Sequence, residues 1–584
     1  MTVIILPQNM ADTRTAPRTS GEENSENQTE IRQETFLYPV DKSPSLIFLP
    51  LHGLQEAIVS ISGALSTAVL LANQIGAGHL TEVRSQILSL SLFTSGIASL
   101  LQVCIGCRLP VIHGPSGSYL IAIAAILNAP KWSDESLGMD GSANVTSSIS
   151  WKIRMREIQG DLMLASGVQF LLGITGILGF FLRFIGPLTV APTVLVLGLT
   201  LGRYVVPLCE QHWGIASLST VLVLVFSMFL AKVSIPFPGY NRKKKCHVTH
   251  YPLFQLNAVV LAIGLSWCLC HVLTVTDVLS SNSTVHGHMA RTDVRTSALY
   301  NAPWFYFPLP FQFGTPTISS SGFTAMLIIT IVNIIQVPGF YSATASVVEL
   351  PPPPAHALNR GIAVDGISSA ISGMLGGVYS SILYIQSLGV VTVTKVASRS
   401  VFVTAALILM IGGVVGKVGA VFTIIPDPVV GGVNFVAVGT VTAVGVSMSN
   451  AVDLSSSRNL LILGISLSLG LLLPDWMAAN ENSINTGNEV LDQLLEVLLV
   501  TPMFVTMFSG CVLDNLAPGT QEERGMAKRN LEAARDTQET TDDPYRLPYI
   551  STYMDKLRCC SYFPASPTFK QVLVTCNKKK EETI

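Results

Sequence analysis

Long apolar segments are the feature that most constrains how this chain of 584 residues can fold. About fourteen stretches of roughly 17 to 25 mainly apolar residues recur along it, and each can cross the ~30 Å hydrocarbon core of a bilayer. The composition agrees, because 49% of the residues are hydrophobic and only 12% are charged, against about 25% charged residues in soluble proteins. We therefore predict an all-α, polytopic membrane protein whose surroundings are the lipid bilayer.

The candidate spans divide into two series of seven. They run roughly over 50–72, 85–106, 109–128, 160–184, 188–205, 214–233, 252–275, 321–341, 362–378, 380–397, 399–417, 428–447 and 458–474, with a last span within 487–513. The third span of each series, 109–128 and 380–397, is broken by Gly, Ser or Pro, and we expect short extended stretches there. Corresponding broken spans indicate two inverted repeats, about 45–233 and 252–515, with a binding site at their interface.

The regions outside the spans predict how the chain lies in the membrane. Residues 1–44 are polar and predict a disordered cytosolic tail, residues 45–515 form the membrane domain, and 516–584 predict a cytosolic C-terminal tail. The basic connection 241–247 (NRKKKCH) between the sixth and seventh spans indicates the cytosolic side. Counting from it, the N-glycosylation sequons at Asn144 and Asn282 face outward. We expect a glycosylated plasma-membrane protein with both termini in the cytosol.

Several function classes have no support in the sequence. It contains no phosphate-binding P-loop, no H-E-x-x-H helix and no G-x-S-x-G nucleophile motif. We expect no enzyme activity, no cofactor, no bound metal and no nucleic-acid partner. A secondary transporter or a channel for a small solute remains, because broken half-helices with polar tips are suited to solute capture.

One amide stands in the apolar stretch 333–341, NIIQVPGFY. Gln336 can donate and accept hydrogen bonds, so it can read an amide or lactam edge of a substrate. Alternatively, it bonds a neighbouring helix. Pro338 and Gly339 follow, and we expect them to break the helix or to form a tolerated kink.

The broken spans carry the other polar candidates for a substrate site. Tyr384 and Gln386 lie two residues apart, so in extended backbone both side chains face one pocket; alternatively, the tyrosine packs in the bundle and the amide caps the next helix. Ser116, Ser118 and Tyr119 form the equivalent polar edge in the first half.

Two ionisable residues are candidates for ion or proton coupling. Glu56 lies within the first span, where a carboxylate is expensive and indicates function, unless the span begins later and Glu56 lies near the interface. His113 is either a proton-responsive group or a satisfied donor in the broken span. Asp427, at the start of a later span, is expected to cap its helix.

Five longer motifs carry a family resemblance. They are GPLTVAPTVLVLGL (186–199), PPPPAHALNRGIAVDG (351–366), PDPVVGG (426–432), AVDLSSSRNLLILG (451–464) and LDNLAPGTQEERG (513–525). In this order they resemble the nucleobase-ascorbate transporter family, specifically its animal branch, solute carrier family 23. The resemblance implies fourteen segments in two inverted repeats of seven, a core and a gate domain, a homodimer, and an elevator-like motion of the core against the gate.

The family signature, (Gln, Glu or Pro)-Asn-x-Gly-x-x-x-x-Thr-(Arg or Lys), has a partial counterpart. Here it reads QSLGVVTVTK (386–395), so Ser387 replaces the expected Asn, whereas four positions match: Gln386, Gly389, Thr394 and Lys395. Gln at the first position implies a nucleobase carrier, since ascorbate carriers typically have Pro there. Tyr384 also matches an aromatic contact of some nucleobase members.

The coupling positions depart from the family pattern. Its eighth span usually carries Glu-x-x-Gly, which falls on Gln336 and Gly339, and Phe340 stands where sodium-coupled ascorbate members have Asp. Glu56 replaces His in the first span, and His113 replaces Gln in the third. Because Gln keeps hydrogen bonding but removes a charge, the resemblance argues against ordinary sodium-ascorbate symport, although sodium or proton coupling through Glu56 stays open.

We therefore expect a secondary transporter of a nucleobase, a purine such as hypoxanthine or uracil. Its substrate-binding residues are expected to be Gln336, Gly339, Tyr384, Gln386, Ser387, Gly389, Ser116, Ser118 and Tyr119. The alternatives are an ascorbate transporter, sodium-coupled or sodium-independent, and a non-transporting membrane receptor or regulatory protein that kept the fold.

Overall fold

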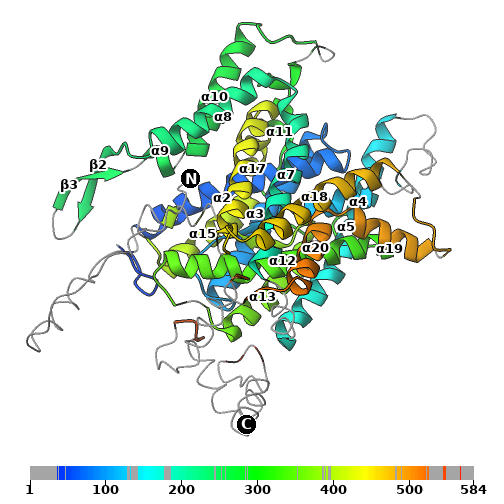
Figure 1. Cartoon of the computed structure of the whole chain (residues 1–584). Helices are drawn as coiled ribbons and strands as arrows, with labels where there is room; N and C mark the ends of the chain where they lie inside the picture. The colour runs from blue at the N-terminus through cyan, green and yellow to red at the C-terminus, as the bar shows by residue number, and fades with distance from the viewer. Residues whose placement is uncertain are drawn as a thin grey trace, which may run out of the picture.

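The computed structural model is mostly helical (Figure 1). It describes residues 36, 38–45, 48–127, 132, 143–176, 186–241, 245–251, 253–256, 258–282, 285, 287–351, 353–384, 387, 390–391, 396–450, 452–480, 483–487, 489–520, 523–524, 544–547, 564 and 566.

The helices follow the order of the predicted spans. The first half contains α2 (Leu49–Gln74), α3 (Thr81–Cys104), α4 (Tyr119–Leu127), α5 (Ala143–Thr175), α7 (Pro187–Cys209), α8 (Trp213–Leu224) continued by the π-helix η2 (Val225–Phe229), α9 (Leu253–Leu256) and α10 (Ala258–Val275). The second half contains η3 (His288–Ala290), α11 (Thr296–Asn301), α12 (Ser320–Val347), α13 (Ala355–Leu375), α15 (Arg399–Val414), α16 (Gly416–Thr423), α17 (Asp427–Ser449), α18 (Ser457–Ala479), α19 (Glu489–Val500) and α20 (Pro502–Leu516).

Many of these helices are suited to a bilayer. Within the described part of the chain, eight are long and apolar enough to cross it: α2, α3, α5, α7, α10, α12, α17 and α18. The segment formed by α8 and η2, and helix α15, are shorter and also apolar. A multi-pass, mostly helical membrane protein is thereby confirmed.

Both predicted broken spans contain extended backbone. Strand β1 (His113–Pro115) pairs antiparallel with β4 (Ser381–Leu383), and Gly114 lies opposite Ile382. This pairing satisfies peptide groups that lipid could not. A second pair, β2 (Ile235–Asn241) and β3 (Lys245–Tyr251), forms a hairpin that projects from the helices (Figure 1). The all-α prediction did not include this hairpin, whose strands flank the basic connection.

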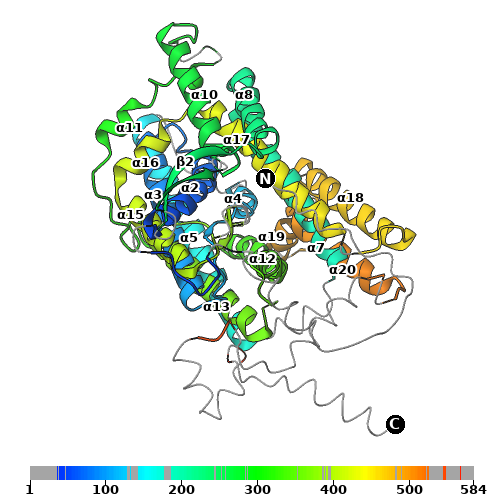
Figure 2. The ribbon, with the colours of Figure 1, turned by 90° about the vertical axis from the view of Figure 1, so that its left-hand side faces the viewer.

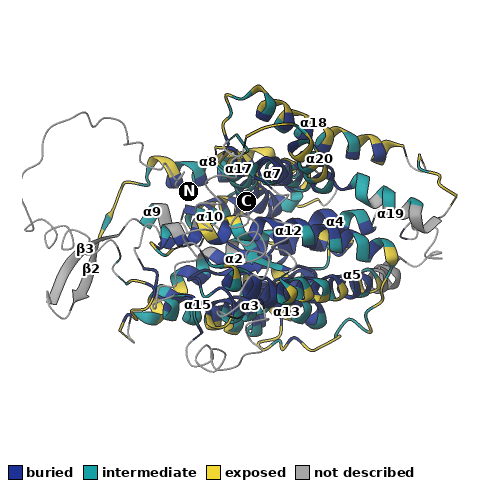
Figure 3. Cartoon of the chain, turned by 60° about the horizontal axis from the view of Figure 1, so that its bottom comes forward, coloured by how far each residue is buried: buried dark blue, intermediate teal, exposed yellow. Residues whose placement is uncertain are grey.

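The helices form two groups by their contacts. The first consists of α2, α3, α4, α5, α12, α13, α15 and α16 with both short strands β1 and β4, and the second of α7, α8, α10, α17, α18 and α20. In Figure 2, α3, α13 and α15 lie on one side and α7, α18 and α20 on the other. Buried residues line α2, α3 and α12, whereas α18 carries many exposed ones (Figure 3). The two groups meet where α12 contacts α20 and α2 contacts α10, and α19 contacts both α12 and α18.

Three helix pairs pack through reciprocal glycines: α3 with α15, α5 with α13, and α7 with α17. A Cβ atom added at any of six glycines would lie no more than 2.7 Å from a backbone atom of the partner helix: Gly96 and Gly413, Gly173 and Gly366, Gly198 and Gly445. Small residues let helix backbones approach closely in lipid, where van der Waals packing drives association. These glycines therefore set the spacing of the main helix pairs.

Several predicted boundaries were wrong. Helix α12 continues through Pro338 and Gly339 to Val347, so the stretch is not a helix break; the missing proline N–H is tolerated inside a membrane bundle. Helix α5 begins at Ala143, before the predicted start at 160, and ends before Gly176, whose φ is +65°. The last predicted span consists of two helices, α19 and α20.

Parts of both tails pack against the first helix group. The Ala397 N–H donates to the Tyr38 carbonyl at 2.9 Å, so ordered chain begins before residue 45. In the C-terminal tail, Tyr545 is fully buried and its hydroxyl donates to the Pro351 carbonyl at 2.5 Å. Three successive tail carbonyls accept hydrogen bonds from three arginines: Pro544 from Arg399, Tyr545 from Arg360 and Arg546 from Arg108.

Candidate functional site

The crossing of β1 and β4 positions the first set of candidate residues. The ladder extends beyond the strands, because the Tyr384 N–H donates to the Ile112 carbonyl at 2.9 Å and the Ser116 N–H to the Ser380 carbonyl at 3.1 Å. Helix α4 begins four residues after Pro115. The crossing thus holds the polar edges of both broken spans beside each other.

The first-half edge makes a buried polar cluster with α12. The Ser116 and Ser118 hydroxyls are 2.5 Å apart, and Ser118 donates to Asn333 Oδ1 at 3.0 Å. Asn333 Nδ2 lies 3.4 Å from Ser116 Oγ, and the hydroxyls of Tyr119 and Thr330 are 2.7 Å apart. The structure therefore brings together the predicted residues Ser116, Ser118 and Tyr119.

Gln336 lies one helical turn after Asn333 on α12. Its side chain is 1% exposed, and neither Nε2 nor Oε1 has a hydrogen-bond partner among the described residues. A buried polar group without a partner costs about 1–3 kcal/mol. The alternative in which Gln336 bonds a neighbouring helix is therefore not what the described residues show.

Glu56 is buried on α2 and is linked to the strand crossing. It is 3% exposed, and α2 already begins at Leu49, so Glu56 lies inside the helix and away from solvent. The Ser387 hydroxyl hydrogen-bonds the Glu56 carboxyl group and accepts from the Ile112 N–H at 3.4 Å. Glu56 Oε2 has no partner among the described residues. A carboxyl oxygen and a whole amide are thus left available inside the fold.

Tyr384 is buried, and its hydroxyl is already engaged. It donates to the Pro115 carbonyl at 3.3 Å. The ring lies against α2 and β1, because a Cβ atom added at Gly63 or Gly114 would meet it at 2.9 Å or less. In this arrangement, Tyr384 supports the strand crossing and covers β1 with its ring.

Comparisons with known proteins show the family to which this chain belongs. The profile of the permease family (Xan_ur_permease) matches residues 49–479. Solute carrier family 23 member 2 of Mus musculus is 39% identical over 542 residues, covering 92% of this chain and 83% of that protein. Member 1 of Mus musculus is 36% identical, covering 92% and 89%, respectively.

A plant relative extends the likeness. Nucleobase-ascorbate transporter 12 of Arabidopsis thaliana is 28% identical and covers 94% of this chain and 77% of its own length. The chain belongs to solute carrier family 23, the nucleobase-ascorbate transporters. The predicted class is confirmed: this member of the family is a membrane transporter and not an enzyme.

In this family member, His113 joins a different buried network from Ser116 and Ser118. Its Nε2 lies 3.4 Å from Tyr341 Oη and 3.8 Å from Asp365 Oδ1. Asp365 also accepts from Gln102 at 2.7 Å and from Tyr341 at 3.2 Å. His113 Nδ1 has no partner among the described residues. The network connects β1 with α3, α12 and α13 and stabilises the first helix group.

The remaining predicted residues fall in different places. Gln386, Gly389, Thr394 and Lys395 lie outside the described residues. Gly339 faces the second helix group, because a Cβ atom added there would lie 3.1 Å from Met448 Cε of α17. Asn144 stands at the start of α5, and Asn282 follows α10 in the next connection. Asp427, expected to cap α17, is the first residue of that helix and follows the N-cap Pro426; its carboxylate pairs with arginines.

Sequence reasoning missed Thr330 and Asn333. Both lie on α12 and contact the first-half edge. A signal was present, since Thr330, Asn333 and Gln336 follow one another at i, i+3 spacing in the mainly apolar stretch 325–341, and such residues are neighbours on the helix surface. A row of three polar residues on one side of a membrane helix indicates a polar contact more strongly than a single amide does.

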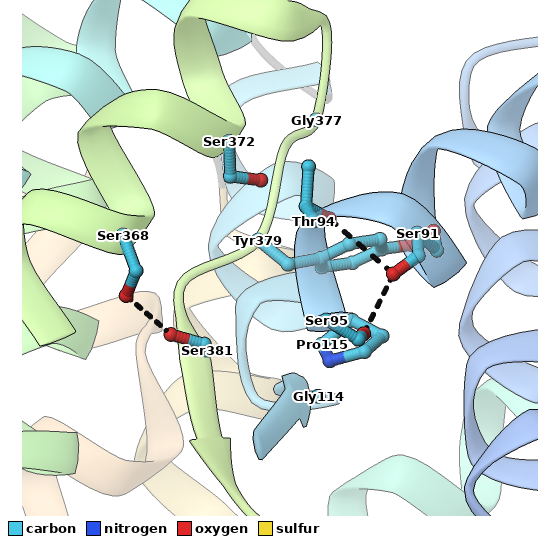
Figure 4. Close-up of a pocket in the computed structure, with 10 residues that line it drawn as sticks. All are labelled: Ser91, Thr94, Ser95, Gly114, Pro115, Ser368, Ser372, Gly377, Tyr379 and Ser381. Carbon is cyan, nitrogen blue, oxygen red and sulfur yellow. Dashed lines mark hydrogen bonds between the residues drawn. The ribbon is translucent and has the colours of Figure 1, made fainter. Parts of the chain in front are cut away.

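A small cavity lies beside the strand crossing, between α3 and α13 (Figure 4). Its lining is rich in hydroxyls, from Ser91, Thr94, Ser95, Ser368, Ser372 and Ser381. Three of these hydroxyls donate to carbonyls of their own helix: Ser91 to Ile87, Thr94 to Leu90 and Ser95 to Ser91. The volume of about 10 Å³ suits roughly one water molecule. The cavity is too small for an organic solute.

Proposed function

We propose that this transporter carries a nucleobase, a purine such as hypoxanthine or uracil, held beside the crossing of β1 and β4. The observation that carries the proposal is Gln336, whose amide donor and acceptor are both buried and without a partner among the described residues. The lactam edge of a nucleobase offers one acceptor and one donor side by side. A primary amide complements this edge with two parallel hydrogen bonds.

The surroundings of Gln336 support a ligand that is polar and uncharged. Asn333 and the serines of the first-half edge supply further neutral donors and acceptors on the same helix and the adjoining strand end. Gln336 itself carries no charge to balance an anion. A site built to hydrogen-bond one edge of a substrate discriminates strongly against molecules that lack that edge.

The arrangement of helices supports an elevator mechanism with inverted repeats. For this correspondence the boundary between the repeats lies after α10, not between residues 233 and 252. Each span of the first half then corresponds to the span seven places later, so α3 corresponds to α13 and α5 to α15. Under this correspondence, the packed pair α3 and α15 is equivalent to the packed pair α13 and α5, and the pair α7 and α17 is equivalent to itself. These three pairs are the ones that pack through reciprocal glycines. The membrane domain is predicted to have fourteen segments. We assign the first helix group to its core domain and the second helix group to its gate domain.

The proposed setting follows the positive-inside rule. The hairpin of β2 and β3 flanks the basic connection and lies in the cytosol with both termini, while Asn144 and Asn282 face outward at the plasma membrane. The transporter works as a homodimer, as the resemblance implies. Glu56 is the coupling group for sodium or a proton, since in the part of the chain that the structure describes it is a buried acid with one oxygen left unpaired.

Uptake of labelled hypoxanthine, uracil and ascorbate, in cells expressing the chain, tests the proposal. We expect saturable nucleobase uptake, and we expect Gln336→Ala to raise KM about tenfold, because two hydrogen bonds of about 0.5–1.5 kcal/mol each are lost. Gln211→Ala is the matched control, since Gln211 is only partly buried and its amide donates to the nearby Pro207 carbonyl at 3.5 Å. Gln336→Glu restores the acid of the family pattern and should make uptake more dependent on pH or sodium.

The same panel separates the alternatives. Ascorbate uptake without nucleobase uptake would show an ascorbate transporter, and removal of sodium would then show whether it is sodium-coupled. Absence of uptake for all three solutes, with normal amounts of protein at the cell surface, would support a receptor or regulatory protein. An equal effect of Gln336→Ala and Gln211→Ala would remove Gln336 from the site.

A further inference from the structure

A buried ion network joins the two helix groups far from the strand crossing. Asp427, in the first turn of α17, accepts from Arg84 Nη2 of α3 at 2.8 Å. Arg295, just before α11, donates to both carboxylate oxygens of Asp427, at 2.9 and 2.5 Å. The three side chains are between 2% and 10% exposed. Two cations thus share one carboxylate inside the protein.

The helices that this network connects belong to different groups. Helix α3 packs on α2, α13, α15 and α16, whereas α17 packs on α7, α8 and α10. The reciprocal glycines hold α3 and α17 to their own partners, α15 and α7. The contact between Arg84 and Asp427 is therefore polar and crosses the boundary between the groups.

Arg84 is poorly suited to permanent burial. Its Nε and Nη1 have no partner among the described residues, and an unpaired buried donor costs about 1–3 kcal/mol. Arg84 also lies in the first turn of α3, where the helix dipole disfavours a cation. Both costs are relieved when water reaches Arg84. The arrangement fits a contact that forms in one state and breaks in another.

A second contact across the same boundary lies deeper along α17. The Ser66 hydroxyl of α2 hydrogen-bonds Asn434 Oδ1, and Asn434 Nδ2 has no partner among the described residues. Asn434 follows Asp427 by seven residues, which places it on the same face of α17 about 10 Å deeper. A solute entering from the end where α3 begins would meet the ion network before Ser66.

We propose that Arg84, Asp427 and Arg295 form a latch that closes the outer path to the substrate site and opens during each transport cycle. This path faces outward in the membrane orientation proposed above. The latch holds the two groups together at the face where α3 begins. Its opening hydrates Arg84 and exposes Ser66.

Cysteine labelling tests the latch without any substrate. Ser66→Cys is introduced as the reporter, and intact cells are treated with a membrane-impermeant methanethiosulfonate biotin reagent. The chain without the reporter gives the background from its own cysteines. We expect Asp427→Asn to speed labelling of the reporter thiol about tenfold, which corresponds to a loss of about 1.4 kcal/mol of closing free energy.

A second variant guards against a folding defect. Asp427→Asn leaves two arginines unpaired, so Arg84→Gln removes one cation instead and keeps Asp427 paired with Arg295; we expect faster labelling of the reporter here too. Asp475→Asn is the matched control, because Asp475 pairs with Arg203 inside the second group. It should leave the labelling rate unchanged, with surface amounts measured by biotinylation.

The outcomes separate the hypotheses. Unchanged labelling in both latch variants would overturn the latch, and so would an equal gain in Asp475→Asn, since that would indicate general loosening. A gain seen only in permeabilised cells supports the latch and reverses the orientation. Because no solute is used, a failure to transport nucleobases does not affect the result.

Discussion

Helix α15 offers a sharp test of the packing, because two neighbouring glycines on it have different surroundings. A Cβ atom added at Gly413 would lie 2.6 Å from the Phe93 nitrogen and 2.6 Å from the Ser89 oxygen of α3. At Gly412 such an atom meets nothing within 4 Å. Carbon contacts are ordinarily about 3.5–4.0 Å. Gly413→Ala therefore requires the distance between α3 and α15 to increase by about 1 Å.

The two variants together isolate the cost of this clash. Both gain up to about 1 kcal/mol of helix propensity, and only Gly413→Ala pays the overpacking, which is about 1–3 kcal/mol. We therefore expect Gly413→Ala to be less stable than Gly412→Ala by about 1–3 kcal/mol. Thermal unfolding of the purified protein in detergent, followed by size-exclusion chromatography, measures the difference. Equal unfolding temperatures would refute the close approach of the two helices.

Three further outcomes are expected. Asn333→Ala should raise the KM for the transported solute roughly fivefold to tenfold, because one buried hydrogen-bonding group worth about 1–1.5 kcal/mol is lost; the exposed Asn515, changed to Ala, should leave uptake unchanged. Asn282→Gln should increase the electrophoretic mobility of the mature protein part of the way to that of enzymatically deglycosylated chain, because the sequon at Asn144 remains; unchanged mobility would show that Asn282 carries no glycan. Tyr545→Ala should speed proteolysis of the C-terminal tail in permeabilised cells, whereas Tyr545→Phe, which keeps the buried ring, should have a smaller effect.

The sequence predicted the membrane segments well where hydrophobicity alone determines them. The starts of α2, α7 and α17 lie close to their predicted starts, and both broken spans contain extended backbone. The predicted helix boundaries were wrong where the helix does not end at the same residues as the apolar stretch. Helix α5 extends well ahead of its apolar part, and Pro338 does not interrupt α12, since neighbouring helices support it.

The candidate site was predicted in part. Glu56 and Gln336 are buried, and Ser116, Ser118 and Tyr119 lie in one polar cluster. Their role in binding a substrate stays a prediction. Which long-range partners these side chains meet depends on the crossing of two segments more than 250 residues apart, as the pairing of Gly114 with Ile382 illustrates. Local patterns do not encode such contacts. The same holds for Asp427, whose local position indicates a helix cap, whereas Arg84 and Arg295 arrive from distant parts of the chain.

The docked C-terminal segment 544–547 has a consequence for anything that competes with it. The segment is joined to the end of α20 through 517–543, so its docking is intramolecular, with an effective concentration on the order of millimolar. A protein that binds the same three arginines must exceed this local concentration, even where its intrinsic affinity equals that of the tail. Cutting the chain anywhere between α20 and Pro544 removes this advantage and leaves the arginine surface open to partners that the intact chain excludes.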